Sequence, residues 1–221
     1  MTSIEAYKKF ELKVNNINTA SNIDISIGEF VLIYNEQQNK WTLDRYRGRS
    51  KDFDINDIQL LISTDKNLGT GTDAGRFERF SIPSDYLDYI SAYAKAKKGG
   101  CTDRVLYAYK VKLNEIDLHL KDENQKPSFE YHETPLTISE NSIQVYKTDF
   151  AIDSVFLTYY RFPKPIDIAG YTRLDGTAST NVDPELDDIS VDYIIDWCAL
   201  EVQRLAENPQ GFQLSANRLI N

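Results

Sequence analysis

The sequence predicts an α+β fold in which a helical part is combined with an antiparallel β-meander. Two patterns carry this prediction. A long segment with helical apolar spacing follows Asp183-Pro184, whereas short runs of β-branched and aromatic residues recur between residues 104 and 160. We expect one structural unit with three regions: a mainly helical region over 1–103, a β region over 104–168, and a loop, long helix and docking tail over 169–221.

The first helix is expected over residues 2–17. Thr2 and Glu5 have the spacing of a capping box, in which each residue binds the backbone N–H of the other. Apolar residues then recur at helical intervals. The apolar face is expected to contain Ile4, Tyr7, Val14 and Ile17.

The next segment mixes strand and helix signals. Residues 30–34 form an apolar, β-rich run, and a second helix is expected to start at residue 35. Its basic residues, from Lys40 to Lys51, are expected to form a solvated face rather than an anion site. Residues 54–62 suggest a short helix, and residues 63–76 a polar, glycine-rich loop.

A further helix is predicted over residues 84–98. It follows Pro83, and its last turn would contain lysines 95, 97 and 98, where cations favour the negative end of the helix dipole. Gly99 would supply the left-handed residue that commonly ends a helix.

Short strands are expected in the β region, because apolar runs alternate with turn sequences at spacings that favour an antiparallel meander. The turns include 125–127, 139–141 and 148–149. The expected strands are 105–113, 129–132, 136–138, 143–146 and 155–160.

The final helix is expected over residues 184–206, with Asp183 as N-cap and Pro184 in the first turn. Two apolar stripes suggest burial on two sides, against the core and against another surface. One stripe is Leu186, Ile189, Tyr193, Trp197 and Leu200; the other is Val191, Ile194 or Ile195, Cys198, Val202 and Leu205. The polar tail that follows, with isolated Phe212, Leu214, Leu219 and Ile220, either dangles or docks onto a neighbour.

Composition narrows the classes of function. The formal charge of −9 disfavours binding to phosphate backbones and suits either simple solubility or a surface that DNA passes without sticking. Two cysteines, Cys101 and Cys198, exclude a disulfide framework and fit a reducing cytoplasm. No secretory leader is expected at the N-terminus, and no apolar run is long enough to span a bilayer.

No motif indicates catalysis, a metal or a cofactor. The only histidines are His119 and His132, and the sequence lacks the spacings of zinc sites. The loop 69–75 has neither the dinucleotide nor the P-loop pattern, and the calcium-like spacing of 122–133 has Pro127 where a glycine is needed. Acidic residues 183–192 are explained most simply by helix capping. We therefore expect that the protein is not an enzyme. The sequence contains too many paired carboxylates to single out a glycosidase site, so that activity is not supported, although it is not excluded.

Five segments together carry a resemblance to a known group of proteins. They are FVLIYNEQ (30–37), KPSFEYHET (126–134), VFLTYYRFPKPID (155–167), the loop that ends in Glu185-Leu186, and IIDWCA (194–199). This combination resembles head-to-tail connector and tail ring proteins of tailed bacteriophages, particularly of the crass-like phages. Each segment is a packing or turn pattern rather than a chemical signature.

The resemblance implies a structural virion protein, assembled in the host cytoplasm, that forms a homo-oligomeric ring at the head-to-tail interface. A twelvefold ring would connect the portal protein to other tail proteins and line the channel through which the genome passes without specific binding. A closed ring needs two different patches on each subunit. Tyr193 and Trp197 are expected on one, and Tyr159, Tyr160 and Arg161 near the other.

Two alternatives remain open from the sequence. The five interface candidates can instead belong to the core of an ordinary monomer. The protein can also be a tail-tip or receptor-binding module, in which exposed tyrosines and tryptophans on the β-meander recognise a glycan or a host surface protein.

Overall fold

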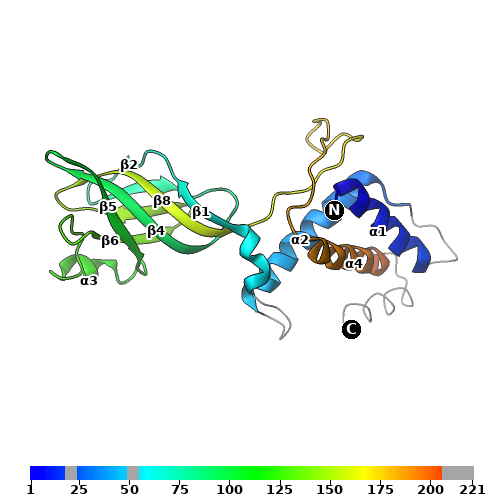
Figure 1. Ribbon diagram of the computed structural model, residues 1–221, viewed down its shortest axis with the longest axis horizontal. Coiled ribbons are helices and arrows are strands. Elements are labelled where there is room, and N and C mark those ends of the chain that lie inside the picture. The colour runs from blue at the N-terminus through cyan, green and yellow to red at the C-terminus, as the bar shows by residue number, and fades with distance from the viewer. Residues whose placement is uncertain (18–23, 49–54, 206–221) are drawn as a thin grey trace. The chain divides into compact units, whose positions relative to one another are not determined.

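The computed structural model describes residues 1–17, 24–48 and 55–205 and confirms the α+β class (Figure 1). The chain forms two compact units, Met1–Leu60 with Pro163–Asn221, and Leu61–Phe162. We call them the helical unit and the β unit. The β unit is thus an insertion in the sequence of the helical unit. The expected boundary at residues 103–104 differs from this division, because it falls inside the strand Cys101–Lys110.

Among the described residues, three α-helices build the helical unit: α1 (Ser3–Ile17), α2 (Ile27–Arg47) and α4 (Asp188–Leu205). Helix α4 packs against both α1 and α2 (Figure 1). A 3-10 helix, η1 (Ile55–Leu61), lies where a short helix was predicted over 54–62. Within the described residues, no helix combines the length and the apolar composition that a bilayer crossing requires.

Helix α1 begins as predicted. The backbone N–H of Thr2 donates to Glu5 Oε2 at 2.8 Å, and that of Glu5 donates to Thr2 Oγ1 at 3.2 Å. Its buried face agrees with the expected one only in part: Val14 is buried as predicted, but Ile4 is exposed, and Ala6 and Phe10 are buried instead. The side chain of Ile17 lies outside the described residues. The bulky Phe10 sets the face because it contacts Phe30 of α2, with ring centroids 4.9 Å apart.

Helix α2 begins eight residues earlier than predicted, so the expected strand over 30–34 is wrong. Ser26 and Glu29 form a capping box, with Ser26 N–H donating to Glu29 Oε2 at 2.9 Å. This start places Phe30 and Tyr34 one turn apart on a buried face. The expected solvated basic face is also interrupted, because Arg45 is buried and pairs with Asp57 at 3.0 Å. Arg49 and Lys51 lie outside the described residues.

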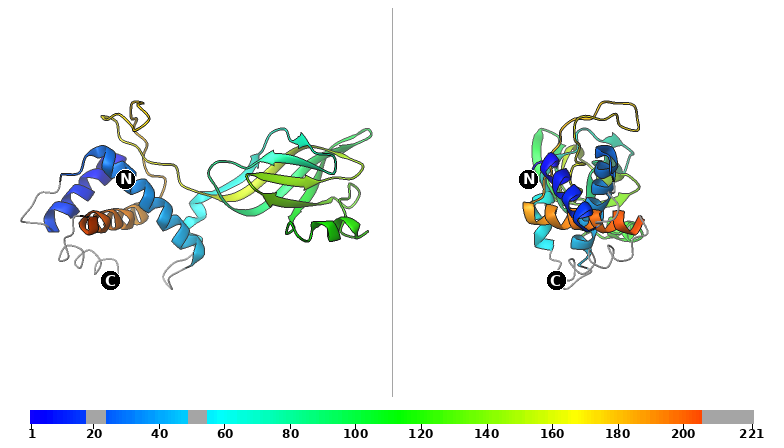
Figure 2. Two further views of the ribbon diagram at one scale, coloured as in Figure 1. Left: turned by 180° about the vertical axis from the view of Figure 1, so that it is seen from behind. Right: turned by 90° about the vertical axis from the view of Figure 1, so that its right-hand side faces the viewer.

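The β unit is one curled eight-stranded sheet, seen from behind in Figure 2. Its spatial order is β1-β8-β4-β5-β6-β7-β3-β2, and every neighbouring pair is antiparallel except β5 and β6. The predicted meander is therefore only partly correct. The strands are β1 (Ile62–Asn67), β2 (Thr72–Asp73), β3 (Phe77–Ser81), β4 (Tyr86–Lys98), β5 (Cys101–Lys110), β6 (Glu133–Ser139), β7 (Ser142–Tyr146) and β8 (Ala151–Arg161).

The largest correction is β4, which was predicted as a helix over 84–98. The segment has a period of two: Ala92, Ala94 and Ala96 are buried, and the residues between them lie on the other face. Gly99 does adopt a left-handed conformation, with φ of 57°, but it turns the chain from β4 into β5. Lysines followed by a glycine are typical of the C-terminus of a helix, but the same residues are also compatible with a hairpin turn.

Other differences are local. Strands β1 and β2 occupy the predicted loop 63–76, residues 129–132 form no strand, and a short helix, α3 (Ile116–Lys121), precedes them. The predicted turn at 139–141 is confirmed between β6 and β7. The core of the β unit is formed mainly by Phe80, Ala92, Ala94, Ala96, Leu106, Ala108, Leu136, Ile143, Val145, Val155, Leu157 and Tyr159.

Candidate functional site

Helix α4 has one buried face and one exposed apolar face. The buried face contains Val191, Ile194, Ile195, Cys198 and Val202, in agreement with one predicted stripe. On the other predicted stripe, Leu186 is buried, but Ile189 is 72% exposed and Tyr193 is 44% exposed. Trp197 and Leu200 continue this face and are partly buried. We call Ile189, Tyr193, Trp197 and Leu200 the α4 stripe.

The first turn of α4 is capped by Asp187 rather than by the predicted Asp183. Asp187 Oδ1 accepts the backbone N–H groups of Ile189 at 3.0 Å and Ser190 at 2.9 Å. Asp183 serves the neighbouring helix instead, where its Oδ1 accepts the backbone N–H of Ser3 at 2.8 Å. The acidic cluster of 183–192 therefore supplies the starts of two helices.

A row of ion pairs borders the α4 stripe. The N-terminal amine lies 2.6 Å from Asp188 Oδ1, and Lys9 lies 2.8 Å from Asp192 Oδ1. Lys13 pairs with Asp196 at 2.8 Å. The three carboxylates on this side of α4 thus have cationic partners on α1 or at the residues before it, and each charge at the border of the stripe has a partner of opposite sign.

The second group of predicted interface residues lies in the β unit, not in the unit that contains Tyr193 and Trp197. Tyr159 is 2% exposed, because Val155, Leu157 and Tyr159 share the core face of β8. Its hydroxyl donates to Asp85 Oδ1 at 2.9 Å. Tyr159 is therefore a core residue, which corrects the expectation of a surface contact. Tyr160 and Arg161 are partly buried, and the Arg161 guanidinium donates to the Phe162 carbonyl at 3.3 Å.

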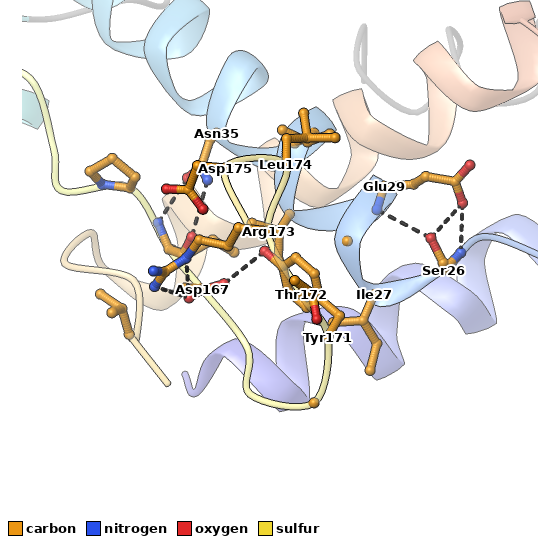
Figure 3. A pocket seen from close by; sticks show the side chains of 17 residues that line it. Ser26, Ile27, Glu29, Asn35, Asp167, Tyr171, Thr172, Arg173, Leu174 and Asp175 are labelled. Carbon is orange, nitrogen blue, oxygen red and sulfur yellow. Dashed lines mark hydrogen bonds and ion pairs between the residues drawn. The ribbon is translucent and has the colours of Figure 1, made fainter. Parts of the chain in front are cut away.

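A cavity of about 960 Å³ lies in the helical unit, between the first half of α2 and residues 165–182 (Figure 3). We call residues 169–182, predicted as a loop, the arm. The arm is held at its base by an antiparallel bridge between Asp167 and Val182. Most of the lining is apolar, with contributions from Ile27, Val31, Leu32, Ile166, Tyr171 and Leu174.

Asp167 organises the arm from a buried position. Its Oδ2 accepts from Arg173 Nη2 at 2.6 Å, and its Oδ1 accepts from the Tyr171 hydroxyl at 2.8 Å (Figure 3). The same Oδ2 accepts from the Thr180 backbone N–H at 2.8 Å. Burial alone would raise the pKa of Asp167, but these hydrogen bonds outweigh it and lower the pKa to about 2. Asp167 and Arg173 are therefore an ion pair at neutral pH.

The Tyr171 ring closes the floor of the cavity against α2. A Cβ atom at Gly28 would lie 3.2 Å from Cδ2 of this ring, so the helix and the ring are in close contact. Burial and the hydrogen bond to Asp167 raise the pKa of Tyr171 to about 12. The ring thus remains neutral and adds to the apolar wall.

The remaining charges of the cavity are negative. Arg173 is matched by Asp167, which leaves the carboxylates of Glu29 and Asp175 in the lining. Hydrogen bonds from Ser26 lower the pKa of Glu29, and hydrogen bonds from Thr177 lower that of Asp175, so both are ionised at neutral pH. The cavity therefore suits an apolar group that carries positive charge. The sequence analysis missed this site, because its walls come from segments more than a hundred residues apart.

The other candidate chemistry has a structural explanation. Within residues 1–17, 24–48 and 55–205, no three His, Cys, Asp or Glu side chains gather in a way that would hold a metal ion. Cys198 is fully buried on α4, and burial raises the pKa of its thiol, which makes it a poor nucleophile. In the glycine-rich loop, Gly71 lies against the Phe80 ring, where a Cβ would be only 2.6 Å from Cζ.

Comparisons with known proteins leave the family of this chain open. No protein-family model matches the sequence, and no curated protein matches it.

Proposed function

We propose that the protein is a structural subunit of a virion ring at the head-to-tail junction of a tailed bacteriophage. In this role it connects the portal to the tail, and copies of the chain surround the DNA channel. The α4 stripe is the observation that carries the proposal. It is an apolar helix face that the described residues of the helical unit leave exposed at Ile189 and Tyr193 and cover only in part at Trp197 and Leu200.

Such a face has an unfavourable hydration free energy that a neighbouring subunit would relieve. Fully burying one large apolar side chain is worth about 1.5–3 kcal/mol. Contiguous apolar surface with a polar border is typical of protein interaction sites. The ion pairs of Asp188 with the N-terminal amine and of Asp192 and Asp196 with α1 provide this border, and in each of them the charge has a partner.

A ring of identical subunits also needs a second, different patch on each copy. We assign it to the surface of the β unit near Tyr160 and Arg161, which Tyr159 supports from the core side. Twelve copies would match a twelvefold portal. The net charge of −9 suits a channel that DNA passes without binding.

Mass photometry of the purified chain, alone and with the portal protein of the same genome, tests the proposal. Discrete particles near the mass of a dodecamer, or portal rings decorated by the protein, are expected. Tyr193→Asp should abolish assembly, whereas Tyr131→Asp, at an exposed tyrosine of the β unit, should assemble normally. Trp197→Asp should also prevent assembly, but Trp197 is partly buried, so circular dichroism must show that this variant is folded.

A protein that remains monomeric and does not bind the portal protein would contradict the ring proposal. It would favour the second candidate, a tail-tip or receptor-binding module. The observation behind this candidate is an aromatic row across three strands of the β unit. Tyr93 is in register with Tyr107 on β5 and with Phe156 on β8, and the Tyr93 and Phe156 rings stack at 4.8 Å. Tyr107 is exposed. Binding on a glycan array, lost in Tyr107→Ala, would support this function.

A further inference from the structure

We propose that the cavity between α2 and the arm is the docking site for the C-terminal segment of this same chain, residues 212–220. This inference concerns a site that the ring proposal does not use, and it holds whether or not the protein assembles into a ring. It rests on the chemistry of the cavity, on the sequence of the segment and on the length of chain that joins them.

The cavity accepts an apolar chain segment better than a polar small molecule. Its polar groups are already paired with one another: Asp167 with Arg173, Tyr171 and Thr180, and the Asn35 side chain with both backbone groups of Ile166 at 3.0 and 2.8 Å. Few directed donors or acceptors remain to orient a polar ligand. Apolar surface remains available, including Leu32, which is 56% exposed.

The C-terminal segment has the matching composition. Residues 206–221 contain four large apolar side chains, Phe212, Leu214, Leu219 and Ile220. The single cationic side chain in this stretch, Arg218, is next to Leu219. Leu219 and Ile220 can fill the apolar part of the cavity while Arg218 approaches the carboxylates of Glu29 and Asp175. The charge of the segment thus complements the excess negative charge of the cavity.

The length of the connecting chain permits this contact. Helix α4 ends at Leu205, and Leu219 follows 14 residues later. Fourteen residues span up to roughly 46 Å when extended. The 18 residues of α4 itself cover only about 27 Å at the helical rise. Because α4 belongs to the same unit as the cavity, the segment can reach the cavity of its own copy or that of an adjacent copy.

Disulfide trapping in the full-length protein tests the assignment. In a Cys101→Ser background, which removes the exposed thiol and keeps the buried Cys198, Leu32→Cys is combined with Leu219→Cys. The matched control combines Leu12→Cys, an exposed position on α1 outside the cavity lining, with the same Leu219→Cys. Circular dichroism verifies that each variant is folded.

We expect the Leu32 pair to form a disulfide about tenfold faster than the Leu12 pair, because docking raises the effective concentration of the two thiols. Adding Arg218→Glu should slow the Leu32 pair by about tenfold and leave the Leu12 pair unchanged. Cross-linked monomers would indicate docking within one copy, and cross-linked dimers docking between copies. Both products support the assignment.

Equal rates for the Leu32 and Leu12 pairs would overturn the proposal. So would a Leu32 pair whose rate is insensitive to Arg218→Glu, because the charge match is part of the argument. Disulfides formed between Leu32→Cys chains that lack Leu219→Cys would show that α2 of a second copy occupies the cavity instead. None of these results affects the ring proposal, which is tested by particle mass and by Tyr193→Asp.

Discussion

The helical unit and the β unit differ in net charge and in how many of their buried polar side chains have hydrogen-bond partners. Residues 61–162 contain 13 Lys and Arg against 15 Asp and Glu, whereas the rest of the chain contains 12 against 19. Most of the net charge of −9 therefore belongs to the helical unit. The α4 stripe and the cavity beside the arm belong to it as well.

The interior of the helical unit contains buried polar side chains along α2. Among the described residues, Tyr34 Oη, Gln38 Oε1 and Trp41 Nε1 are buried without a hydrogen-bond partner. Each unsatisfied buried group costs about 1–3 kcal/mol. The sheet of the β unit pairs most of its backbone groups along its strands instead. Within the β unit, His119 Nδ1 is the corresponding buried atom without a partner. Because α2 alone contains three such atoms, we expect the helical unit to be the less stable of the two.

The largest expected effect on stability comes from large-to-small substitutions in the core of one unit at a time. Leu157→Ala, in the β unit, should destabilise that unit by about 2–5 kcal/mol. Both tryptophans, Trp41 and Trp197, belong to the helical unit, so tryptophan fluorescence reports on that unit alone. We expect the fluorescence transition to stay in place while the far-ultraviolet dichroism of the sheet is lost earlier.

The matched variant in the helical unit is Ile195→Ala, at a buried position of α4. It should shift the fluorescence transition and leave the sheet signal unchanged. If each variant shifted both signals equally, the two units would unfold as one, and the comparison between them would fail.

A smaller effect, again confined to the helical unit, is expected when the centre of the arm is broken. Asp167→Asn removes the charge that Arg173, Tyr171 and Thr180 share, and should cost about 2–3 kcal/mol. Urea unfolding followed by tryptophan fluorescence measures the loss. Asp175→Asn, at an exposed carboxylate on the same arm, is the control and should change stability much less than Asp167→Asn does.

Acid should have the same effect as that substitution. The pKa of Asp167 in the folded protein, about 2, lies below the ordinary value of 3.8. Its contribution to stability is therefore fully present above about pH 4 and is lost as the pH falls toward 2. Melting temperatures from fluorescence should fall through this window in the wild type. The fall should be shallower in Asp167→Asn, and an equal slope in both proteins would contradict the assignment.

The smallest effect separates two neighbouring aspartates at the start of α4, of which only Asp187 accepts hydrogen bonds from the first turn. Asp187→Ala should cost about 1 kcal/mol, because it removes the acceptor of two backbone N–H groups. Asp188→Ala removes only an exposed ion pair with the N-terminal amine, so it should change stability much less than Asp187→Ala does. Thermal unfolding followed at 222 nm compares them, and a larger loss in Asp188→Ala would refute the cap.

Some elements could be predicted from the sequence because they depend only on interactions between residues close together in the chain. The capping box of Thr2 and Glu5 involves only neighbours in the chain, and it starts α1 as predicted. The same motif at Ser26 and Glu29 was overlooked, and a five-residue apolar run was interpreted as a strand instead. Short apolar runs do not distinguish the two structures by themselves. The prediction of a helix at β4 was wrong for a related reason. Alanines and lysines favour helices in isolation, but buried and partly buried residues alternate in β4 with the period of two that indicates a strand.

The sequence by itself determined the α+β class, the long C-terminal helix and the two apolar stripes of that helix, because these depend on spacing along one segment. Only the tertiary structure decided which stripe was buried, since that depends on which face of α4 packs against α1 and α2, and Val191 and Ile195 lie on the buried face. It also decided that Tyr159 belongs to the core and that Asp167, Arg173 and α2 form a cavity. Those outcomes depend on contacts between residues far apart in the chain, and periodicity within one segment contains no information about its partners.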